Sequence, residues 1–353
     1  MKELNLEDYG LPAEVLESNG GSIPARVIAV HRERYELVCK HGQTFGKLKS
    51  SAFFAESSDE FPTTGDFVLI NYNPNGESPI VKTLPRHSFF SRRDPDKGRG
   101  EQAVAANFDY VFIMQSLNQD FNLKRLERYI TLAWQSGATP VLIFTKADLM
   151  EDCHEQLEAT SEISCGVEIH AVSALDGTGL EDLTAYLQPG KTVVFLGSSG
   201  VGKSSLVNRL AGKEIMKVRE VRDDDDKGRH TTTHRQLVRL DNGAMIIDTP
   251  GMRELGMWDV SAGLGEAFSD VERYFPDCKF SDCQHKTEPG CAVKAALETG
   301  ELSLERWESY LRLKREAKYT DDKVAYLQSV RQRGKDLSKW NKQKKKTRGE
   351  AKW

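Results

Sequence analysis

The sequence has little that would place the protein in a membrane or outside the cell. Among its 353 residues there is no apolar run of the length needed to span a bilayer. The first eight residues, Met1–Asp8, lack the apolar core of a secretory signal peptide. We therefore expect a cytoplasmic protein that makes no membrane contact.

Cysteine is also scarce, because the chain has only six. Three of them are scattered, and we expect buried or free thiols at Cys39, Cys153 and Cys165. The other three lie within fourteen residues and share that segment with a histidine. This usage suits a reducing compartment, with a metal site rather than a framework of disulfides.

The clustered cysteines follow the spacing Cys-x4-Cys-x-His-x5-Cys. Three thiolates and one imidazole match a closed, tetrahedral structural zinc site. Because no ligand position is left open, we expect one structural Zn²⁺ ion there and no chemistry. A chance grouping of cysteines is the alternative interpretation. The expected zinc ligands are Cys278, Cys283, His285 and Cys291.

Neither sign of charge dominates the whole chain. The formal net charge of −4 argues neither for nor against nucleic acid. The distribution is more informative, because residues 331–353 carry ten Lys or Arg and only two Asp or Glu. This basic tail could order on RNA phosphates, with Trp340 stacking on a base, or could serve only to keep the chain soluble.

The most informative stretch is rich in glycine and serine. It follows an apolar run, Thr192–Leu196, and precedes the predicted start of a helix. In that context the pattern GxxxxGK[ST] is typical of a loop that wraps phosphate groups with its backbone N–H groups. Lys203 would reach the β- and γ-phosphates, and the Ser204 hydroxyl would bind Mg²⁺. The expected loop comprises Gly197, Ser198, Ser199, Gly200, Val201, Gly202, Lys203, Ser204 and Ser205.

Two short polar motifs follow predicted buried strands earlier in the chain. We expect both at the carboxyl edge of one parallel α/β sheet, where such sheets bind ligands. The carboxylate of Asp148 can accept from two donors of guanine that adenine lacks, and the Lys146 stem can lie on the base. A backbone N–H near Ala174 can donate to the guanine O6. A TKxD motif alone is often only a surface cap, so its value comes from sharing a sheet with the phosphate loop. The expected base-binding residues are Thr145, Lys146, Asp148, Ser173 and Ala174.

The chain beyond the phosphate loop has a long polar segment and then another strand end. We expect the four aspartates of this segment, Asp223–Asp226, in a solvated loop. A hydroxyl of the threonines that follow, assigned here to Thr232, could complete the Mg²⁺ shell when the γ-phosphate is present. Asp248 would hold Mg²⁺ through water, and the Gly251 amide would sense the γ-phosphate.

The part of the chain before these motifs, residues 22–87, shows short alternating runs separated by turn signals. Five or so short strands in this length favour a small antiparallel barrel, with an OB-fold as the leading candidate. Such barrels often bind nucleic acid, and a purely structural barrel fits the pattern equally well. The polar and basic residues 88–100 are expected to form a linker.

The parts of a GTPase are thus all predicted, but the base-recognition motifs precede the phosphate loop. In this order the chain resembles a circularly permuted GTPase. With the barrel before it and the zinc segment after it, the chain is similar to the ribosome small-subunit-dependent GTPase A family (RsgA, also called YjeQ). The residues that carry the resemblance are GRHTTT at 228–233, DCQH at 282–285, EPGCAV at 288–293 and FNLKRL at 121–126.

The resulting fold class is multidomain. We expect an N-terminal OB-fold β-barrel, a central α/β circularly permuted P-loop GTPase domain and a C-terminal α-helical zinc-binding domain. The expected boundaries are an acidic extension (1–21), the barrel (22–87), a linker (88–100), the GTPase domain (101–260), the zinc-binding domain (261–330) and the basic tail (331–353).

The resemblance implies a cytoplasmic factor that hydrolyses GTP late in the maturation of the small (30S) ribosomal subunit. It would bind 16S rRNA, use Mg²⁺ with GTP and leave the mature particle after hydrolysis, with turnover slow alone and faster on the subunit. We expect a monomer. The alternatives are an RNA-binding assembly factor that uses GTP only as a conformational ligand, and a P-loop ATPase.

The resemblance also implies a catalytic residue, and one position of this chain differs from the family pattern. Conventional GTPases orient the attacking water with a glutamine at the position held here by Met252. The resemblance implies that His230 takes over this role, with His234 as the next candidate. The family usually has asparagine where this chain has Thr145, so a lower affinity for guanine is one expectation.

Overall fold

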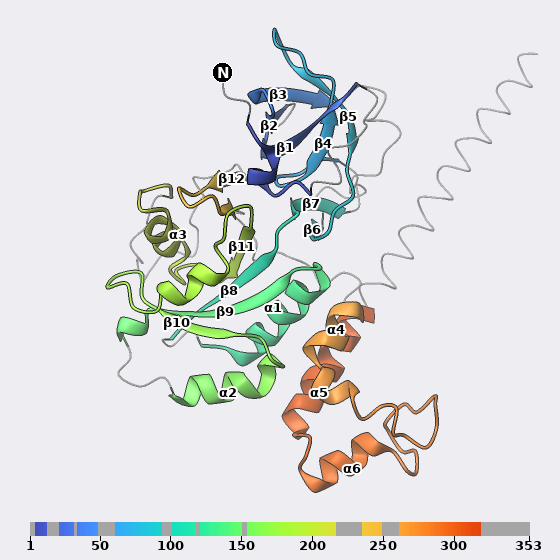
Figure 1. Ribbon diagram of the computed structural model, residues 1–353. Helices are drawn as coiled ribbons and strands as arrows, with labels where there is room; N and C mark the ends of the chain where they lie inside the picture. Colours follow the sequence, from blue (N-terminus) through green and yellow to red (C-terminus); the bar gives the residue numbers. More distant parts are fainter. Residues whose placement is uncertain are drawn as a thin grey trace, which may run out of the picture. The chain divides into compact units, whose positions relative to one another are not determined.

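The computed structural model describes residues 4–12, 21–31, 34–48, 61–93, 101–117, 121–149, 154–216, 235–248 and 261–318 (Figure 1). The chain divides into two compact units, one of residues 1–256 with 266–269 and the other of residues 257–265 with 270–353. None of the helices in the described ranges has the length and apolar character that crossing a bilayer requires.

The first unit opens with a short 3-10 turn, Leu6–Tyr9, and a five-stranded barrel. The strands are β1 (Ile23–Val30), β2 (Tyr35–Cys39), β3 (Gly42–Leu48), β4 (Phe67–Ile70) and β5 (Ser78–Thr83). β1 pairs with both β2 and β4, and β5 joins β3 to β4, which closes the barrel. Apolar side chains such as Val27, Leu37 and Ile70 fill its core. The predicted barrel is therefore confirmed.

The segment expected as a linker begins instead with a strand. β6 (Phe89–Arg93) pairs antiparallel with β7 (Glu101–Ala106). Phe90 is buried, and its ring stacks on Phe108 with 4.8 Å between centroids. The prediction of a linker over 88–100 is thus corrected for residues 89–93. The polar and basic composition of this segment indicated a linker, although its Phe90 side chain packs into the core of the unit.

The α/β sheet of the first unit has the strand order β10-β9-β8-β11-β13-β12. Its strands are β8 (Tyr110–Ser116), β9 (Thr139–Thr145), β10 (Ile169–Val172), β11 (Thr192–Gly197), β12 (Gln236–Arg239) and β13 (Met245–Asp248). All neighbours are parallel except β12 and β13. β11 lies inside the sheet, between β8, which precedes it in the chain, and β13, which follows it. This order confirms the predicted circular permutation.

The helices of this unit pack the sheet and position its loops. They are α1 (Leu123–Gln135), α2 (His154–Ser164) and α3 (Lys203–Ala211), with 3-10 turns at Ala147–Leu149 and Glu181–Ala185. α1 begins where the sequence favours it, because the Asn122 side chain accepts from the backbone N–H of Arg125. Phe112 and Phe195 of the sheet and Leu206 of α3 lie together in one core cluster.

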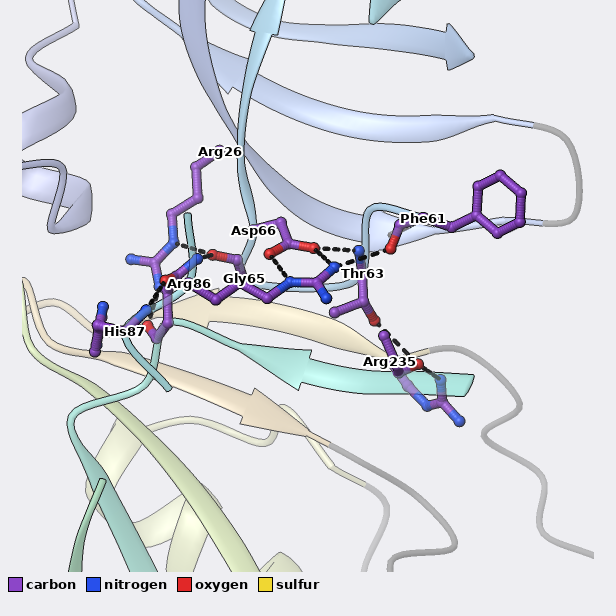
Figure 2. Close-up of polar contacts among 10 residues, drawn as sticks. Arg26, Phe61, Thr63, Gly65, Asp66, Arg86, His87 and Arg235 are labelled. Atoms are coloured by element: carbon purple, nitrogen blue, oxygen red, sulfur yellow. Dashed lines mark hydrogen bonds and ion pairs between the residues drawn. The ribbon is translucent and has the colours of Figure 1, made fainter. Parts of the chain in front are cut away.

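The barrel and the α/β sheet share one continuous sheet. β12 pairs antiparallel with β1, where Ala29 lies opposite Gln236. A buried polar network, which we call the barrel junction, reinforces this pairing (Figure 2). The guanidinium of Arg26, 1% exposed, donates to Gly65 O at 3.3 Å, to Asn107 O at 2.8 Å and to Thr192 Oγ1 at 3.0 Å.

A second buried group completes the barrel junction. The Asp66 carboxylate accepts two hydrogen bonds from Arg86, at 2.8 and 2.7 Å, and one from the Thr63 backbone N–H at 2.7 Å (Figure 2). Thr64 Oγ1 donates to the carbonyl of Arg235 at 3.2 Å. The junction thus holds the chain just before β12 against the barrel.

The C-terminal part of the described chain is helical. It contains α4 (Ser261–Ala267), α5 (Ser269–Glu272), α6 (Ala292–Thr299) and a helix over residues 304–318. Within the second unit, Arg306 donates twice to Asp270 at 2.9 Å, and the rings of Trp307 and Tyr310 stack with centroids 5.5 Å apart. The Trp307 ring also lies edge-on to the His285 ring with centroids 5.8 Å apart, which holds the last helix against the segment that carries the cysteines.

Candidate nucleotide site and cysteine–histidine cluster

The phosphate-loop motif lies between the carboxyl end of β11 and the first turn of α3, as the sequence predicts. Gly200 and Gly202 have φ values of 74° and 99°, in the left-handed region that glycine adopts without strain. A Cβ at Gly197 would lie 2.9 Å from the carbonyl oxygen of Met114 on the neighbouring parallel strand, so only glycine fits here. The loop can therefore turn its backbone N–H groups toward an anion at the start of α3.

Lys203 and Asp248 face each other at this end of the sheet. Lys203 Nζ lies 2.9 Å from Asp248 Oδ1, and their side chains are 26% and 12% exposed. One residue begins α3 and the other ends β13, so the fold brings together groups 45 positions apart. When a nucleotide binds, the lysine can leave the carboxylate for a phosphate, and the carboxylate can bind a metal ion. Both new partners form stronger contacts than the present pair.

The first base motif lies at the end of β9. Thr145 is 4% exposed, and its hydroxyl donates to the carbonyl of Val201 in the phosphate loop at 2.5 Å. Lys146 follows with φ of 61°, a left-handed conformation that non-glycine residues rarely adopt. Asp148 is exposed and lies in the 3-10 turn Ala147–Leu149. The base motif and the phosphate loop are thus joined directly by one hydrogen bond.

The second base motif forms a tight loop after β10. Ser173 is fully buried, and its hydroxyl accepts from the backbone N–H groups of Leu175 at 3.2 Å and Asp176 at 3.3 Å. Its own N–H donates to Thr178 O at 2.9 Å. Ser173 therefore shapes this loop. Of the two residues expected to bind the base here, only Ala174 is partly exposed.

The register of the strands brings these motifs to one edge. Thr145 lies opposite both Ser116 and Val172, and Gly197 lies opposite Met114. Asp248 ends the neighbouring parallel strand and lies opposite Gln236 of β12. We call these strand ends and the loops that follow them the carboxyl edge. The expected position of the motifs at the carboxyl ends of the strands is therefore correct.

Three expected site residues and the acidic run are not among the residues that the structure describes. His230, Thr232 and Gly251 lie outside the described residues, as do Asp223–Asp226. Their roles remain predictions. Sequence reasoning missed the hydroxyl bond from Thr145 to Val201 and the pairing of Lys203 with Asp248, because neither has a local signal in the sequence.

The four expected zinc ligands form a compact cluster in the second unit. Their ligand atoms all lie within 4.8 Å of one another, and His285 Nδ1 is 3.6 Å from Cys278 Sγ and 3.5 Å from Cys291 Sγ. Such distances suit one small ion bound at about 2.0–2.3 Å by each ligand. The cluster supports a metal site formed by Cys278, Cys283, His285 and Cys291.

The surroundings of the cluster fix its loop. The Glu288 carboxylate accepts from the backbone N–H groups of Gln284, Lys286 and Thr287 at 2.8–3.1 Å. The backbone N–H of Glu288 itself, together with these three bonds, lowers the pKa of the Glu288 carboxyl to about 2. Phe275 stacks on the His285 ring with centroids 4.5 Å apart. The loop is therefore shaped by side chains other than the four ligands.

The scattered cysteines include a core thiol. Cys39 is free and fully buried in the barrel, and burial raises its pKa. Cys165 is partly buried, and its thiol donates to the carbonyl oxygen of Ala267 at 3.2 Å, whereas Cys153 lies outside the described residues. The prediction of buried or free thiols holds for the two that are described.

The fold and the carboxyl edge together define a circularly permuted P-loop GTPase. The family model named RsgA GTPase matches residues 83–258. The chain is 47% identical to "Small ribosomal subunit biogenesis GTPase RsgA 1" of Listeria monocytogenes, over 89% of this chain and 90% of that protein. It is 45% identical to "Small ribosomal subunit biogenesis GTPase RsgA" of Methanosarcina acetivorans, over 74% of this chain and 72% of that protein. The chain therefore belongs to the RsgA GTPase family.

Solved structures agree with this assignment. The crystal structure of YjeQ from Thermotoga maritima aligns with a TM-score of 0.64 and 28% identity, covering 84% of this chain and 98% of that one. The structure of YloQ, described as a circularly permuted GTPase, aligns with a TM-score of 0.60 and 24% identity, covering 86% of this chain and 97% of that one. The second likeness concerns the fold alone.

Proposed function

We propose that the protein hydrolyses GTP to GDP and phosphate, and that this reaction is coupled to late maturation of the small ribosomal subunit. The protein binds 16S rRNA in the subunit, and it leaves after hydrolysis. Hydrolysis is slow alone and faster on the subunit. The observation that most supports this proposal is the carboxyl edge of this chain, which belongs to the RsgA GTPase family. There Thr145 of the base motif donates a hydrogen bond to Val201 of the phosphate loop.

The proposed binding of GTP uses the carboxyl edge as a unit. The backbone of residues 197–205 wraps the phosphates, and Lys203 exchanges Asp248 for the β- and γ-phosphates. Mg²⁺ is held by Ser204 and Thr232 and, through water, by Asp248. The Gly251 amide senses the γ-phosphate.

Guanine recognition is proposed for the two base motifs. The Asp148 carboxylate accepts from the N1–H and the exocyclic amine, and the stem of Lys146 lies against the base. The loop shaped by Ser173 presents the N–H near Ala174 to O6. Thr145 faces the phosphate loop through its hydroxyl, so its contribution is to position the base motif. This arrangement favours GTP over ATP, which lacks the paired donors.

The proposed water-positioning residue is His230. Replacing it with alanine should leave GTP binding near normal and lower subunit-stimulated hydrolysis at least ~10-fold, as expected for one positioning residue. Unchanged turnover would remove His230 from the mechanism, and His234→Ala would be measured next.

The cysteine–histidine cluster is proposed to hold one structural Zn²⁺ ion. Zinc contributes on the order of 10 kcal/mol to the folding of comparable small sites. Metal analysis should therefore give one zinc per chain, and Cys283→Ser should lower that content. The remaining expectations are a cytoplasmic monomer, the domain boundaries given above apart from the corrected linker, and a basic tail that contacts RNA phosphates.

The experiment that tests the proposed function compares GTP hydrolysis with and without purified small ribosomal subunits. We expect slow turnover alone and a marked increase when subunits are added. The increase should disappear with Lys203→Ala. If GTP binds but is not hydrolysed faster on the subunit, the alternative is favoured, in which GTP is only a conformational ligand of an RNA-binding factor.

A further inference from the structure

The second base motif follows a short strand at the edge of the α/β sheet. β10 is four residues long, and among the described strands it pairs with β9 alone. Of its four residues only Val172 is buried. Its ladder of hydrogen bonds therefore fixes this strand on one side only. A loop that presents a backbone N–H to a base needs firmer support, because small displacements weaken such a contact.

One tyrosine ties this edge strand to the middle of the sheet. Tyr186 is 8% exposed, and its ring lies edge-on to the rings of Tyr110 and Phe112 on β8, with centroids 5.2 and 5.8 Å apart. Its hydroxyl oxygen lies 2.8 Å from Nε2 of His170 on β10. The same hydroxyl donates to the carboxylate of Glu168, which directly precedes β10. A single side chain thus links the edge strand to a strand two places further into the sheet.

The directions of these hydrogen bonds follow from the hydrogens available. Burial and, after it, the hydrogen bond to Glu168 raise the pKa of Tyr186, so the hydroxyl keeps its hydrogen. A hydroxyl has one hydrogen, which the Glu168 carboxylate accepts. His170 Nε2 must then carry a hydrogen and donate it to the tyrosine oxygen. The Tyr186 hydroxyl is therefore both donor and acceptor to one short segment.

The segment between His170 and Tyr186 contains the whole second base motif. After the loop of this motif, the chain returns beside β10 at Gly179, whose φ is 69°. A Cβ at Gly179 would overlap the carbonyl oxygen of Ala171, so only glycine allows this close return. The chain then places Leu183 in the core, fully buried. The loop is thus closed at its base twice, by the backbone contact and by the Tyr186 hydroxyl.

We propose that Tyr186, His170 and Glu168 are positioning residues for guanine recognition. By fixing β10, they hold the N–H near Ala174 where it meets the O6 of the base. They act through the loop and do not themselves contact the nucleotide. This inference rests on the proposed function, because it names the residues that hold one of the two base motifs in place. The other motif, with Asp148, follows β9 and should not depend on them.

The test measures the affinity of the full-length chain for GDP, ADP and two analogues of GDP. In 6-thio-GDP a sulfur, which is a weaker acceptor, replaces O6. IDP keeps O6 but lacks the exocyclic amine proposed to bind Asp148. The unmodified protein should prefer GDP about 3- to 10-fold over 6-thio-GDP and about 10-fold or more over IDP, whose lost bond goes to a charged group. Competition against fluorescent GDP gives these ratios on one preparation, so a loss of folded protein leaves them unchanged.

Substitutions separate the hydroxyl network from the packing of the ring. Tyr186→Phe removes the hydroxyl and keeps the ring, and it should lower the preference for GDP over 6-thio-GDP to less than about 2-fold. The preference over IDP should stay unchanged. His170→Leu should act like Tyr186→Phe, and His170→Gln, which keeps an N–H donor, should restore the preference. Tyr110→Phe is the matched control, because it removes a hydroxyl from the adjacent ring and leaves the contacts of Tyr186 with β10 in place.

Each outcome either supports or overturns the positioning role. If Tyr186→Phe has the same preferences as the control, the network does not position the base loop. Equal falls in both preferences would also overturn the inference, since the network would then support the whole edge of the sheet. An unmodified protein that prefers GDP over ADP but not over 6-thio-GDP would refute the O6 contact and this inference with it, while recognition of guanine by Asp148 would stand. Equal affinity of the unmodified protein for GDP and ADP would instead count against the proposed function.

Discussion

The barrel junction and the carboxyl edge are both polar centres of the first unit, but their charges are used differently. At the junction, Arg26 is buried and donates to backbone and side-chain oxygens from several segments (Figure 2). Burial lowers its pKa to about 10, which still leaves it charged at neutral pH. At the carboxyl edge, Lys203 and Asp248 retain some exposure and pair mainly with each other.

This difference separates a structural role from a functional one. A buried cation whose donors are already used by the protein has nothing to offer a ligand, and removing it leaves oxygens without partners. A partly exposed pair can release its members to a phosphate and a metal at little cost. We therefore expect changes at the junction to alter stability, and changes at the carboxyl edge to alter nucleotide binding.

The largest effect is expected at the junction. Arg26→Met should lower the free energy of unfolding by about 3–5 kcal/mol, because the buried oxygens of Gly65, Asn107 and Thr192 each lose the hydrogen bond that Arg26 donates. Urea unfolding measures this change. Lys191→Met is the control, since Lys191 pairs with Asp109 nearby at 2.8 Å but is 48% exposed. That change should stay within about 1 kcal/mol. If both variants lower the free energy of unfolding equally, the buried junction is no more important for stability than an exposed ion pair.

Lys203→Ala should have the opposite profile. We expect the affinity for GTP to fall about 100-fold or more, because two charge-assisted phosphate contacts are lost, while the unfolding midpoint changes little. Titration with a fluorescent guanine nucleotide gives the affinity. Lys213→Ala serves as the control, because Lys213 is 58% exposed and pairs only loosely with Asp241 at 3.4 Å. Normal affinity in Lys203→Ala would place the phosphates elsewhere.

Asp148→Asn should change which base binds. The amide can donate to the keto group that replaces the exocyclic amine in xanthine, so GTP affinity should fall about 50-fold and XTP affinity should rise. Competition between GTP and XTP on the same preparation measures the exchange. A parallel loss of both nucleotides would contradict the assignment of Asp148 to the base.

The smallest effect is expected at Thr145. Thr145→Val keeps the shape but removes the hydroxyl that donates to Val201, so affinity for GDP and GTP should fall about 2- to 10-fold. Thr145→Ser restores the hydroxyl and should restore most of the affinity. If valine and serine behave alike, the bond between base motif and phosphate loop does not contribute to binding.

Much of this fold could be predicted from local pattern. The buried strands β8, β9, β11 and β13 are short apolar runs, and the motifs follow them directly. The Cys3His cluster was also predictable, because its members lie within fourteen residues. In such cases the chain itself places the interacting groups near one another.

The junction could not be predicted, because its partners are distant in the chain. Arg26 lies 17, 39, 81 and 166 positions from Tyr9, Gly65, Asn107 and Thr192, whose oxygens accept from it. An arginine within the alternating pattern of β1 looks like a solvated side chain. Strand β6 escaped for a related reason, since the stacking of Phe90 on Phe108 depends on tertiary packing.

Thr145 illustrates a functional detail of the same kind. The sequence showed a departure from the usual asparagine and suggested weaker recognition of guanine. The structure shows the hydroxyl donating to Val201, 56 positions away, so this residue retains a link to the phosphate loop. The effect of a substitution thus depends on the group that the new side chain contacts, and the sequence alone does not show that group.

A crystal structure of the protein with Mg²⁺ and GDP would test the central claim most directly. We predict one guanine nucleotide with its β-phosphate on Lys203 and its base within hydrogen-bond distance of the Asp148 carboxylate. A nucleotide bound with its phosphates on the loop but its base away from Asp148, or bound at another edge of the sheet, would contradict the account.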